Sequence, residues 1–465
     1  MTRRVLHARR VLYGVAPDVQ EGPARVHIDA GVISSVTPGP PAADDERLPD
    51  HVALTPAYVD GHTHAALHGL RGAALAPHAG GNLVEDLFYR FERHLLADDV
   101  RALATLGAYE ALISGTALVW DHYGHAEALA EAFSTAGLSA VVAPTLQDRA
   151  VTGREPWIDG TPAAWRATER IASGAYRGVH AAWGPHATDT VSPALLTAIA
   201  DAARSTGLPV HLHVAQSADE VARAAAEGTT PGARLDVLAD VPTTAVHGLY
   251  LTERDLTAYA TRPTTLIVCP SSQAWFGFPA DVDAWEAAGC RWGVATDAAV
   301  SNDTLAVARE ARTLALLRAA GLTGHATRQA FARSGDPRDA AAHAGVRRAH
   351  LDANPLDAGS LLARVTTIPG AMHPAFRAGA IAPGYRAHLL ALDTEHPCVW
   401  PCPDLARAMT LADAPSAITR MMIDGVWRTA SGAHAATLAA EPALDQARRY
   451  LSVRLPLLLG SASRS

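Results

Sequence analysis

Between residue 56 and about residue 330, strand-like runs alternate with helical stretches, and this alternation limits the fold more than any other feature. The runs are apolar and bounded by Gly or Pro, and the stretches between them place Ala, Leu, Glu and Arg at helical spacing. A strand followed by a helix, eight times in succession, predicts an α/β fold closed into a (β/α)₈ TIM-like barrel. An open doubly wound sheet has the same periodicity and remains an alternative. The eight runs cover residues 58–64, 117–122, 140–146, 178–186, 210–215, 244–249, 265–270 and 292–297.

Short strands separated by Gly and Pro occur at both ends of the chain, outside this alternation. Residues 25–29 and 32–36 have strand-like spacing near one end, and residues 388–392 and 421–427 near the other. We expect the early and late strands to pair in one small discontinuous β-sandwich domain built from both termini. The expected domains are residues 1–55 (first part of the β-sandwich), 56–370 (the barrel), 371–430 (second part of the β-sandwich) and 431–465 (a C-terminal helix and tail).

Charge and composition exclude several kinds of partner. The net charge of the 465 residues is −8 and no basic block occurs, so neither nucleic acid nor an anionic membrane is expected as a partner. No window approaches the ~20 apolar residues of a membrane span, and the N-terminus lacks the apolar core of a signal peptide. Four cysteines are too few for a disulfide scaffold. We therefore expect a cytoplasmic protein whose partner is a small molecule.

The chain contains no lysine, because all 39 basic residues are arginine. Schiff-base catalysis, pyridoxal-phosphate attachment and a Walker-type phosphate loop each need a lysine amine. A metal pair bridged by a carboxylated lysine needs one as well. All four kinds of site are excluded.

Metal-binding residue types stand at the carboxyl ends of several predicted strands, where catalytic side chains of a barrel gather. His62 and His64 follow the first strand two positions apart, so both project to one face and can hold one ion together. Other predicted strands add His186, His213, His247 and Asp297. His211 shares a face with His213 but lies one step deeper, which favours a structural role. The sequence thus predicts one metal ion at the barrel mouth.

The same strand ends carry segments that resemble the amidohydrolase superfamily, in the branch that includes S-adenosylhomocysteine/methylthioadenosine deaminases, guanine deaminase and the triazine hydrolases. The resemblance extends over nearly the whole chain. It implies a hydrolase that attacks the C–N bond of a small amino-heterocycle or an amidine-like substrate. The matching segments are residues 55–72, 184–192, 209–221, 245–256, 269–273, 293–303 and 423–427.

The resemblance also implies a role for each matching residue. His62, His64, His213 and Asp297 match the ligands of a mononuclear site, for which Zn²⁺ is favoured and Fe²⁺ is acceptable. His247 matches a histidine that contacts the attacking water or the reacting atom of the substrate, and Asp297 also serves as the base. His186 matches a position that contacts the substrate. Relatives of this kind often form homodimers.

Gln216 is the main departure from the family pattern. The deaminases carry a glutamate there that shuttles a proton to the ring nitrogen and the leaving group, whereas an amide has no transferable proton near pH 7. Three explanations stay open. Another group near the mouth, such as His122 or Asp121, delivers the proton; the substrate needs less help because it is already protonated or has a good leaving group; or the protein binds metal and ligand without efficient turnover.

Two further residues are candidates for substrate binding. His122 ends the second predicted strand within an unusually polar and aromatic stretch, and Arg149 follows the third strand; a solvent-exposed loop is the competing interpretation for both. Two other enzymatic reactions also remain as alternatives, namely hydrolysis of a cyclic amide and chlorohydrolase-like displacement of a halide.

Overall fold

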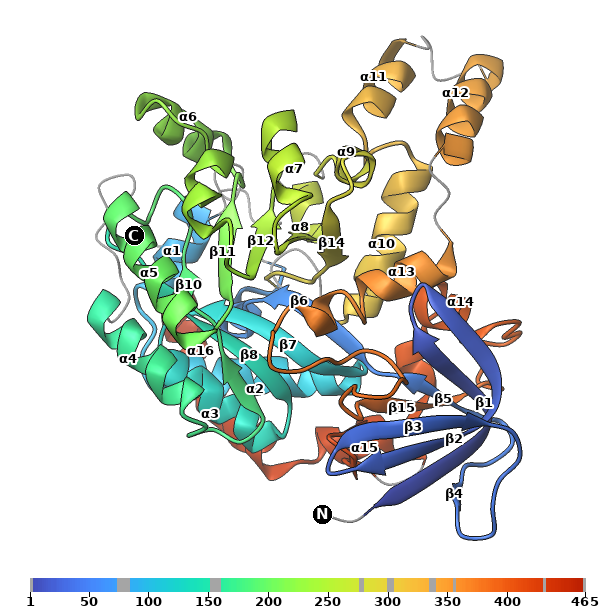
Figure 1. Cartoon of the computed structure of the whole chain (residues 1–465). Coiled ribbons are helices and arrows are strands. Elements are labelled where there is room, and N and C mark those ends of the chain that lie inside the picture. Colours follow the sequence, from blue (N-terminus) through green and yellow to red (C-terminus); the bar gives the residue numbers. More distant parts are fainter. Residues whose placement is uncertain are drawn as a thin grey trace.

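The structure is a computed structural model that describes residues 3–72, 84–150, 160–275, 280–298, 305–333, 340–353, 357–429 and 432–462. It is a mixed α/β fold with three sheets, one of which is largely antiparallel while the other two are parallel. Figure 1 shows the antiparallel strands on one side of the molecule and the helices packed around the parallel strands.

The antiparallel sheet joins both ends of the chain. Its order is β17-β16-β15-β5-β1-β2-β3, and β4 pairs with β1. Leu54 in β5 lies opposite Ala391 in β15, so early and late strands pair as expected. The strands are β1 (Arg4–Val15), β2 (Asp18–Asp29), β3 (Val32–Pro38), β4 (Glu46–Arg47), β5 (Val52–Pro56), β15 (Leu389–Asp393), β16 (Ile418–Ile423) and β17 (Val426–Trp427).

The two parallel sheets carry the predicted strand ends. The first has the order β10-β8-β7-β6 with β9 beside β8, and the second has the order β11-β12-β13-β14. The predicted fourth run, residues 178–186, is divided into β9 and β10. The first sheet comprises β6 (Tyr58–Thr63), β7 (Thr116–Tyr123), β8 (Ser139–Leu146), β9 (Val179–Ala181) and β10 (Gly184–Pro185). The second comprises β11 (Val210–Val214), β12 (Thr243–His247), β13 (Thr264–Val268) and β14 (Arg291–Val294).

Isolated parallel bridges connect the two parallel sheets at both sides. Thr63, at the end of β6, bridges to Asp297 beyond β14. On the other side, Ala187 bridges to His213 in β11. Because every strand runs in the same direction, the carboxyl ends of both sheets meet on one side of the molecule.

Helices follow most of the parallel strands. Ser192 caps α5 by accepting a hydrogen bond from the Leu195 amide, Pro193 occupies the first turn, and Gly207 ends the helix in a left-handed conformation. The helices are α1 (Tyr89–Glu92), α2 (Ala97–Ile113), α3 (Ala126–Ala136), α4 (Thr161–Ala172), α5 (Pro193–Thr206), α6 (Ala218–Ala226), α7 (Glu253–Tyr259), α8 (Pro270–Trp275), α9 (Val282–Ala287), α10 (Val307–Ala319), α11 (His325–Arg333), α12 (Ala340–Ala353), α13 (Ala358–Arg364), α14 (Leu405–Leu411), α15 (His434–Ala439) and α16 (Pro442–Ala462).

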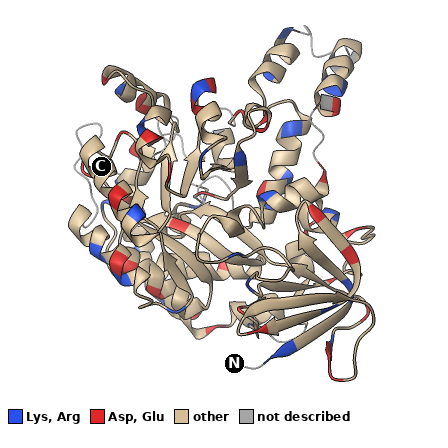
Figure 2. Cartoon of the chain, in the orientation of Figure 1, with Lys and Arg blue, Asp and Glu red and all other residues tan. Residues whose placement is uncertain are grey.

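The parallel strands are buried on both faces, which explains their apolar sequences. Every residue of β7, β8, β11, β12 and β13 is buried. Charged side chains lie mostly on the helices and connecting segments, with both signs interspersed in the view of Figure 2. No helix among the described residues is long and apolar enough to cross a membrane. Acidic and histidine side chains within these five strands are few, namely Asp121, His122, His211, His213 and His247.

Candidate active site

Four histidines and one aspartate converge at the carboxyl ends of the parallel strands. His62 belongs to β6 and His64 follows it, His213 belongs to β11, His247 ends β12, and Asp297 follows β14. Within His62, His64 and His213, and again within His62, His247 and Asp297, one ligand atom per residue lies within 4.8 Å of the others. The structure thus brings together residues that are more than 200 positions apart.

The spacing of these atoms fits a tetrahedral metal site. The Asp297 Oδ1 atom lies 3.4 Å from both His62 Nε2 and His64 Nε2, and His213 Nε2 lies 3.3 Å from His64 Nε2. Ligand atoms at ~2.1 Å from a tetrahedral zinc ion lie about 3.4 Å apart. His62 Nε2 is buried and has no hydrogen-bond partner. The residues present therefore could hold one divalent ion.

Hydrogen bonds to the other ring nitrogens set the histidine tautomers. The Nδ1 atom of His64 lies 2.6 Å from the carbonyl oxygen of His122, and that of His213 lies 2.6 Å from the carbonyl oxygen of His186. Because a carbonyl only accepts, both Nδ1 atoms carry the proton and both Nε2 atoms offer a lone pair. His62 Nδ1 contacts Nε2 of His211 at 2.7 Å, which places His211 directly behind this ligand.

Burial keeps the imidazoles of this cluster neutral. It lowers the pKa values of His62 and His213 well below the usual value, and neighbouring histidines lower them further. Burial also lowers the pKa of His247 to about 4, although Asp297 opposes this shift. Neutral imidazole is the form that binds a metal ion.

The backbone around the acidic ligand is strained and held in place. His247 has a φ of 79° and Asp297 a φ of 62°, both in the left-handed region that non-glycine residues rarely occupy. Asp60 accepts hydrogen bonds from the amide and the hydroxyl of Thr296, at 3.0 Å and 2.5 Å, and so ties β6 to the segment before Asp297. Ser272 donates to Oδ2 of Asp297, which leaves Oδ1 facing the histidines.

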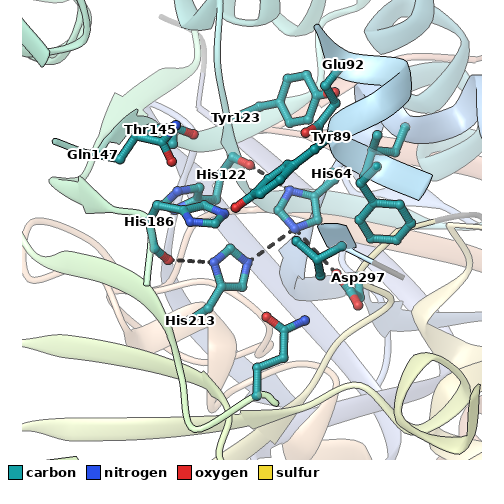
Figure 3. Close-up of a pocket in the computed structure, with 14 residues that line it drawn as sticks. His64, Tyr89, Glu92, His122, Tyr123, Thr145, Gln147, His186, His213 and Asp297 are labelled. Atoms are coloured by element: carbon teal, nitrogen blue, oxygen red, sulfur yellow. Dashed lines mark hydrogen bonds and ion pairs between the residues drawn. The ribbon is translucent and has the colours of Figure 1, made fainter. Parts of the chain in front are cut away.

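A cavity open to solvent lies beside this cluster. Among the residues named from the sequence, His64, His122, His186, His213, Gln216 and Asp297 line it. The remaining lining residues are Leu67, Val84, Phe88, Tyr89, Glu92, Tyr123, Thr145 and Gln147. Figure 3 shows Glu92, Tyr89 and Tyr123 on one side of the cavity and His213 on the other.

Gln216 has the position that the sequence suggested. It lies just beyond β11, and its backbone amide donates to Glu220 Oε2 at 2.7 Å. The other oxygen of Glu220 accepts from the Thr188 hydroxyl. This anchor fixes the backbone of Gln216 while its side chain remains on the cavity wall.

Arg149 is not brought to the cavity. Its guanidinium pairs with Glu227 at 2.8 Å on a partly exposed surface, and it is absent from the cavity lining within the described part of the chain. The side chain of Arg149 turns to Glu227, which lies away from the described cavity lining. Its role in substrate binding stays a prediction.

Glu92 is a cavity residue that the sequence reasoning missed. It ends α1, is only 6% exposed, and lies on the cavity wall. Burial raises its pKa to about 8, although the neighbouring Tyr123 opposes the shift. A signal was present, since Phe88, Phe91, Glu92 and Leu95 have the spacing of an apolar helix face on which an acid is out of place.

Residues 53–428 match the model of the amidohydrolase family. Two curated relatives are 5-methylthioadenosine/S-adenosylhomocysteine deaminases. That of Moorella thermoacetica is 30% identical over 384 residues, covering 81% of each chain, and that of Haloarcula marismortui is 29% identical over 419 residues, covering 88% of each.

Solved structures are similar in fold. A zinc-containing adenosine deaminase from Xanthomonas campestris has a TM-score of 0.78 and 24% identity, and the match covers 96% of this chain and 98% of that one. A guanine deaminase from C. acetobutylicum with bound guanine has a TM-score of 0.73 and 14% identity, with 92% and 100% covered.

Proposed function

The chain belongs to the amidohydrolase family and is a hydrolytic enzyme acting on C–N bonds, and we propose that it deaminates a small amino-substituted heterocycle or amidine-like compound. The observation that carries the proposal is the convergence of three imidazoles and one carboxylate beside a cavity lined by polar and aromatic side chains. The curated relatives named as deaminases support the same class of reaction.

We propose His62, His64, His213 and Asp297 as the ligands of one divalent ion, with zinc as the preferred metal. Three nitrogen ligands and one oxygen ligand suit zinc, and a zinc-containing structural neighbour supports this choice. When bound in such a site, a divalent ion lowers the pKa of a coordinated water towards ~7 and supplies hydroxide near neutral pH.

Asp297 and His247 are the proposed catalytic residues. Oδ1 of Asp297 faces the histidine cluster and accepts the proton of the attacking water, whereas Oδ2 is held by Ser272. His247 is neutral and buried beside the same cluster, where its imidazole orients the water or polarises the atom under attack. His186 and His122 line the side of the cavity where we place the substrate.

The leaving group must receive a proton before it departs as ammonia. A new C–O bond forms at the sp² carbon, the C–N bond breaks, and the nitrogen takes up the proton released by the water. Gln216 can position the nitrogen by hydrogen bonding but holds no transferable proton near pH 7. We propose that the proton comes from Asp297 or from a substrate that is already protonated; another group on the cavity wall, such as His122 or Glu92, is the alternative.

A substrate screen tests this function. Zinc-loaded protein is incubated with amino-heterocycles, amidines, cyclic amides and chloro-heterocycles, and the released ammonia and chloride are measured. Ammonia released from the first two classes supports the proposal. Ring opening without ammonia, or chloride release, favours the two alternative hydrolases, and binding of ligands without any turnover favours a metal-binding protein that has lost catalysis.

We also propose how the strands are arranged into a barrel and a second domain. The bridges Thr63–Asp297 and Ala187–His213 support a closed (β/α)₈ barrel formed from the two parallel sheets. The pairing of β5 with β15 supports one β-sandwich domain drawn from residues 1–55 and 371–430. A homodimer is the expected assembly, and its mass in solution is the direct test.

A further inference from the structure

Glu92 is a buried acid with no ion pair to an arginine among the described residues. Its side chain lies on the cavity wall beside Tyr123. Within the described part of the chain, no arginine forms an ion pair with Glu92 and none lines the cavity. An ionised carboxylate in such surroundings is costly unless an opposite charge accompanies it. The cavity wall therefore offers a place for a positive charge.

Aromatic rings surround the same end of the cavity. Phe88, Tyr89 and Tyr123 all line it, and Tyr89 lies within 6.2 Å of His186 between ring centroids. Figure 3 shows Glu92 beside Tyr123 and Tyr89. The faces of aromatic rings attract cations, and flat heteroaromatic cations gain both this attraction and the apolar contact.

Gln216 has a simple explanation if the substrate arrives as a cation. A neutral amino-heterocycle needs an acid to protonate its ring nitrogen, and Gln216 cannot supply that proton. A substrate that is already protonated carries the proton itself. A positively charged substrate would thus explain both why position 216 carries no acid and why Glu92 places a carboxyl group on the cavity wall.

We propose that the cavity selects a protonated amino-heterocycle, with its amino-bearing carbon at the cluster of His64, His213 and Asp297 and its ring N–H⁺ directed at Glu92. The inference rests on the proposed deamination and names its substrate class. Water adds its oxygen to the amino-bearing carbon, and the C–N bond breaks. One water proton goes to the departing amine and gives ammonia. Of the second water proton and the substrate's ring proton, one stays on the ring nitrogen of the carbonyl product and the other is released, to solvent or to ammonia.

A pair of probes of equal shape tests the charge preference without turnover. 4-Aminopyridine is protonated at neutral pH and has its ring nitrogen opposite the amino group, whereas aniline has the same outline and no charge. Calorimetry with zinc-loaded protein should show that 4-aminopyridinium binds at least about 10-fold more tightly than aniline, since a charge-assisted hydrogen bond is roughly twice as strong as a neutral one.

Two variants test whether Glu92 causes the preference for 4-aminopyridinium over aniline. Glu92→Gln should bring the ratio of the two affinities close to one, whereas Asp86→Asn, the same change of charge in the same segment but off the cavity lining, should leave the ratio unchanged. If Glu92→Gln does not fold, Glu92→Asp should lower the ratio because the carboxylate is withdrawn.

Two results would overturn the inference. One is equal binding of both probes by the unaltered protein. The other is a preference for 4-aminopyridine that survives Glu92→Gln, which would mean that the ring nitrogen binds the metal instead. Absence of ammonia release with every substrate, while the Glu92-dependent preference persists, would contradict only the deamination proposal.

Discussion

The two ends of the cavity differ in how completely their chemistry is specified. At the metal-binding end, His62 lies in β6 and His64 directly follows it, whereas His213 and Asp297 come from β11 and the segment after β14. Three pairs of their ligand atoms lie 3.3–3.4 Å apart, and backbone carbonyls set two of the tautomers. At the far end, Glu92 is a buried acid with no ion pair to an arginine in the described chain. Gln216, three positions after His213 on the cavity wall, stands where the family resemblance implies an acid. We propose that the metal-binding end carries out the reaction and that the far end selects the substrate.

Removing a ligand should have the largest effect. His62→Ala or Asp297→Ala should reduce bound metal from one ion per chain to a trace and lower activity by more than about 10³-fold, because both the site and the base depend on them. Elemental analysis of purified protein measures the metal directly. His51→Ala, a change at the surface, should retain both metal and activity. A fully loaded and fully active Asp297→Ala protein would refute the assignment.

Loss of His211, which lies behind the proposed ligand His62, should have a smaller effect on the metal-binding end. His211→Ala removes the 2.7 Å contact that holds the His62 ring. Metal affinity should fall by about 10–100-fold, the usual cost of losing such a partner. Competition with a chromophoric chelator measures this affinity independently of turnover, and an unchanged affinity would place His211 in a purely packing role.

Gln216→Glu restores the acid that the family resemblance implies at this position of the cavity wall. For neutral amino-heterocycles, kcat should rise by up to about 10²-fold, because a general acid then serves the leaving group. For protonated substrates the gain should be small. Steady-state kinetics with one neutral and one protonated substrate distinguishes these two effects. If kcat is unchanged for both substrates, the side chain at position 216 takes no part in the reaction.

Glu92 should also make stability depend on pH. Its pKa rises from 4.5 to about 8 on folding because of burial, so between these values the folded state binds a proton that the unfolded state has released. The free energy of unfolding should therefore fall as pH rises from about 4.5 to about 8. Subtracting the curve for Glu92→Gln isolates this contribution, and identical slopes for both proteins would show that Glu92 is already ionised.

Arg149→Ala should have the smallest effect. Arg149 makes a partly exposed ion pair with Glu227 and does not line the cavity, and such pairs contribute about 1 kcal/mol or less. Values of kcat/KM and metal content should stay within error. A large rise in KM would return this residue to the substrate site.

The sequence predicted the metal-binding end better than the far end, for a physical reason. His62 and His64 alternate along one strand, and His213, His247 and Asp297 end other parallel strands, so local periodicity places all of them at one edge. The apolar spacing around Glu92 indicates that it is buried, but its place on the cavity wall depends on how α1 packs in the folded protein, which no local pattern encodes. Arg149 shows another limit of sequence-based prediction. The end of the preceding strand sets the position of its backbone, but its side chain pairs with Glu227, which the sequence pattern does not reveal.

The central claim is that His62, His64, His213 and Asp297 hold one divalent ion. Zinc titration of metal-free protein tests this claim most directly. We expect one high-affinity site per chain, with an X-ray absorption spectrum showing nitrogen and oxygen ligands and no sulfur. Binding of no stoichiometric metal, or a zinc–sulfur distance in the spectrum, would contradict the account.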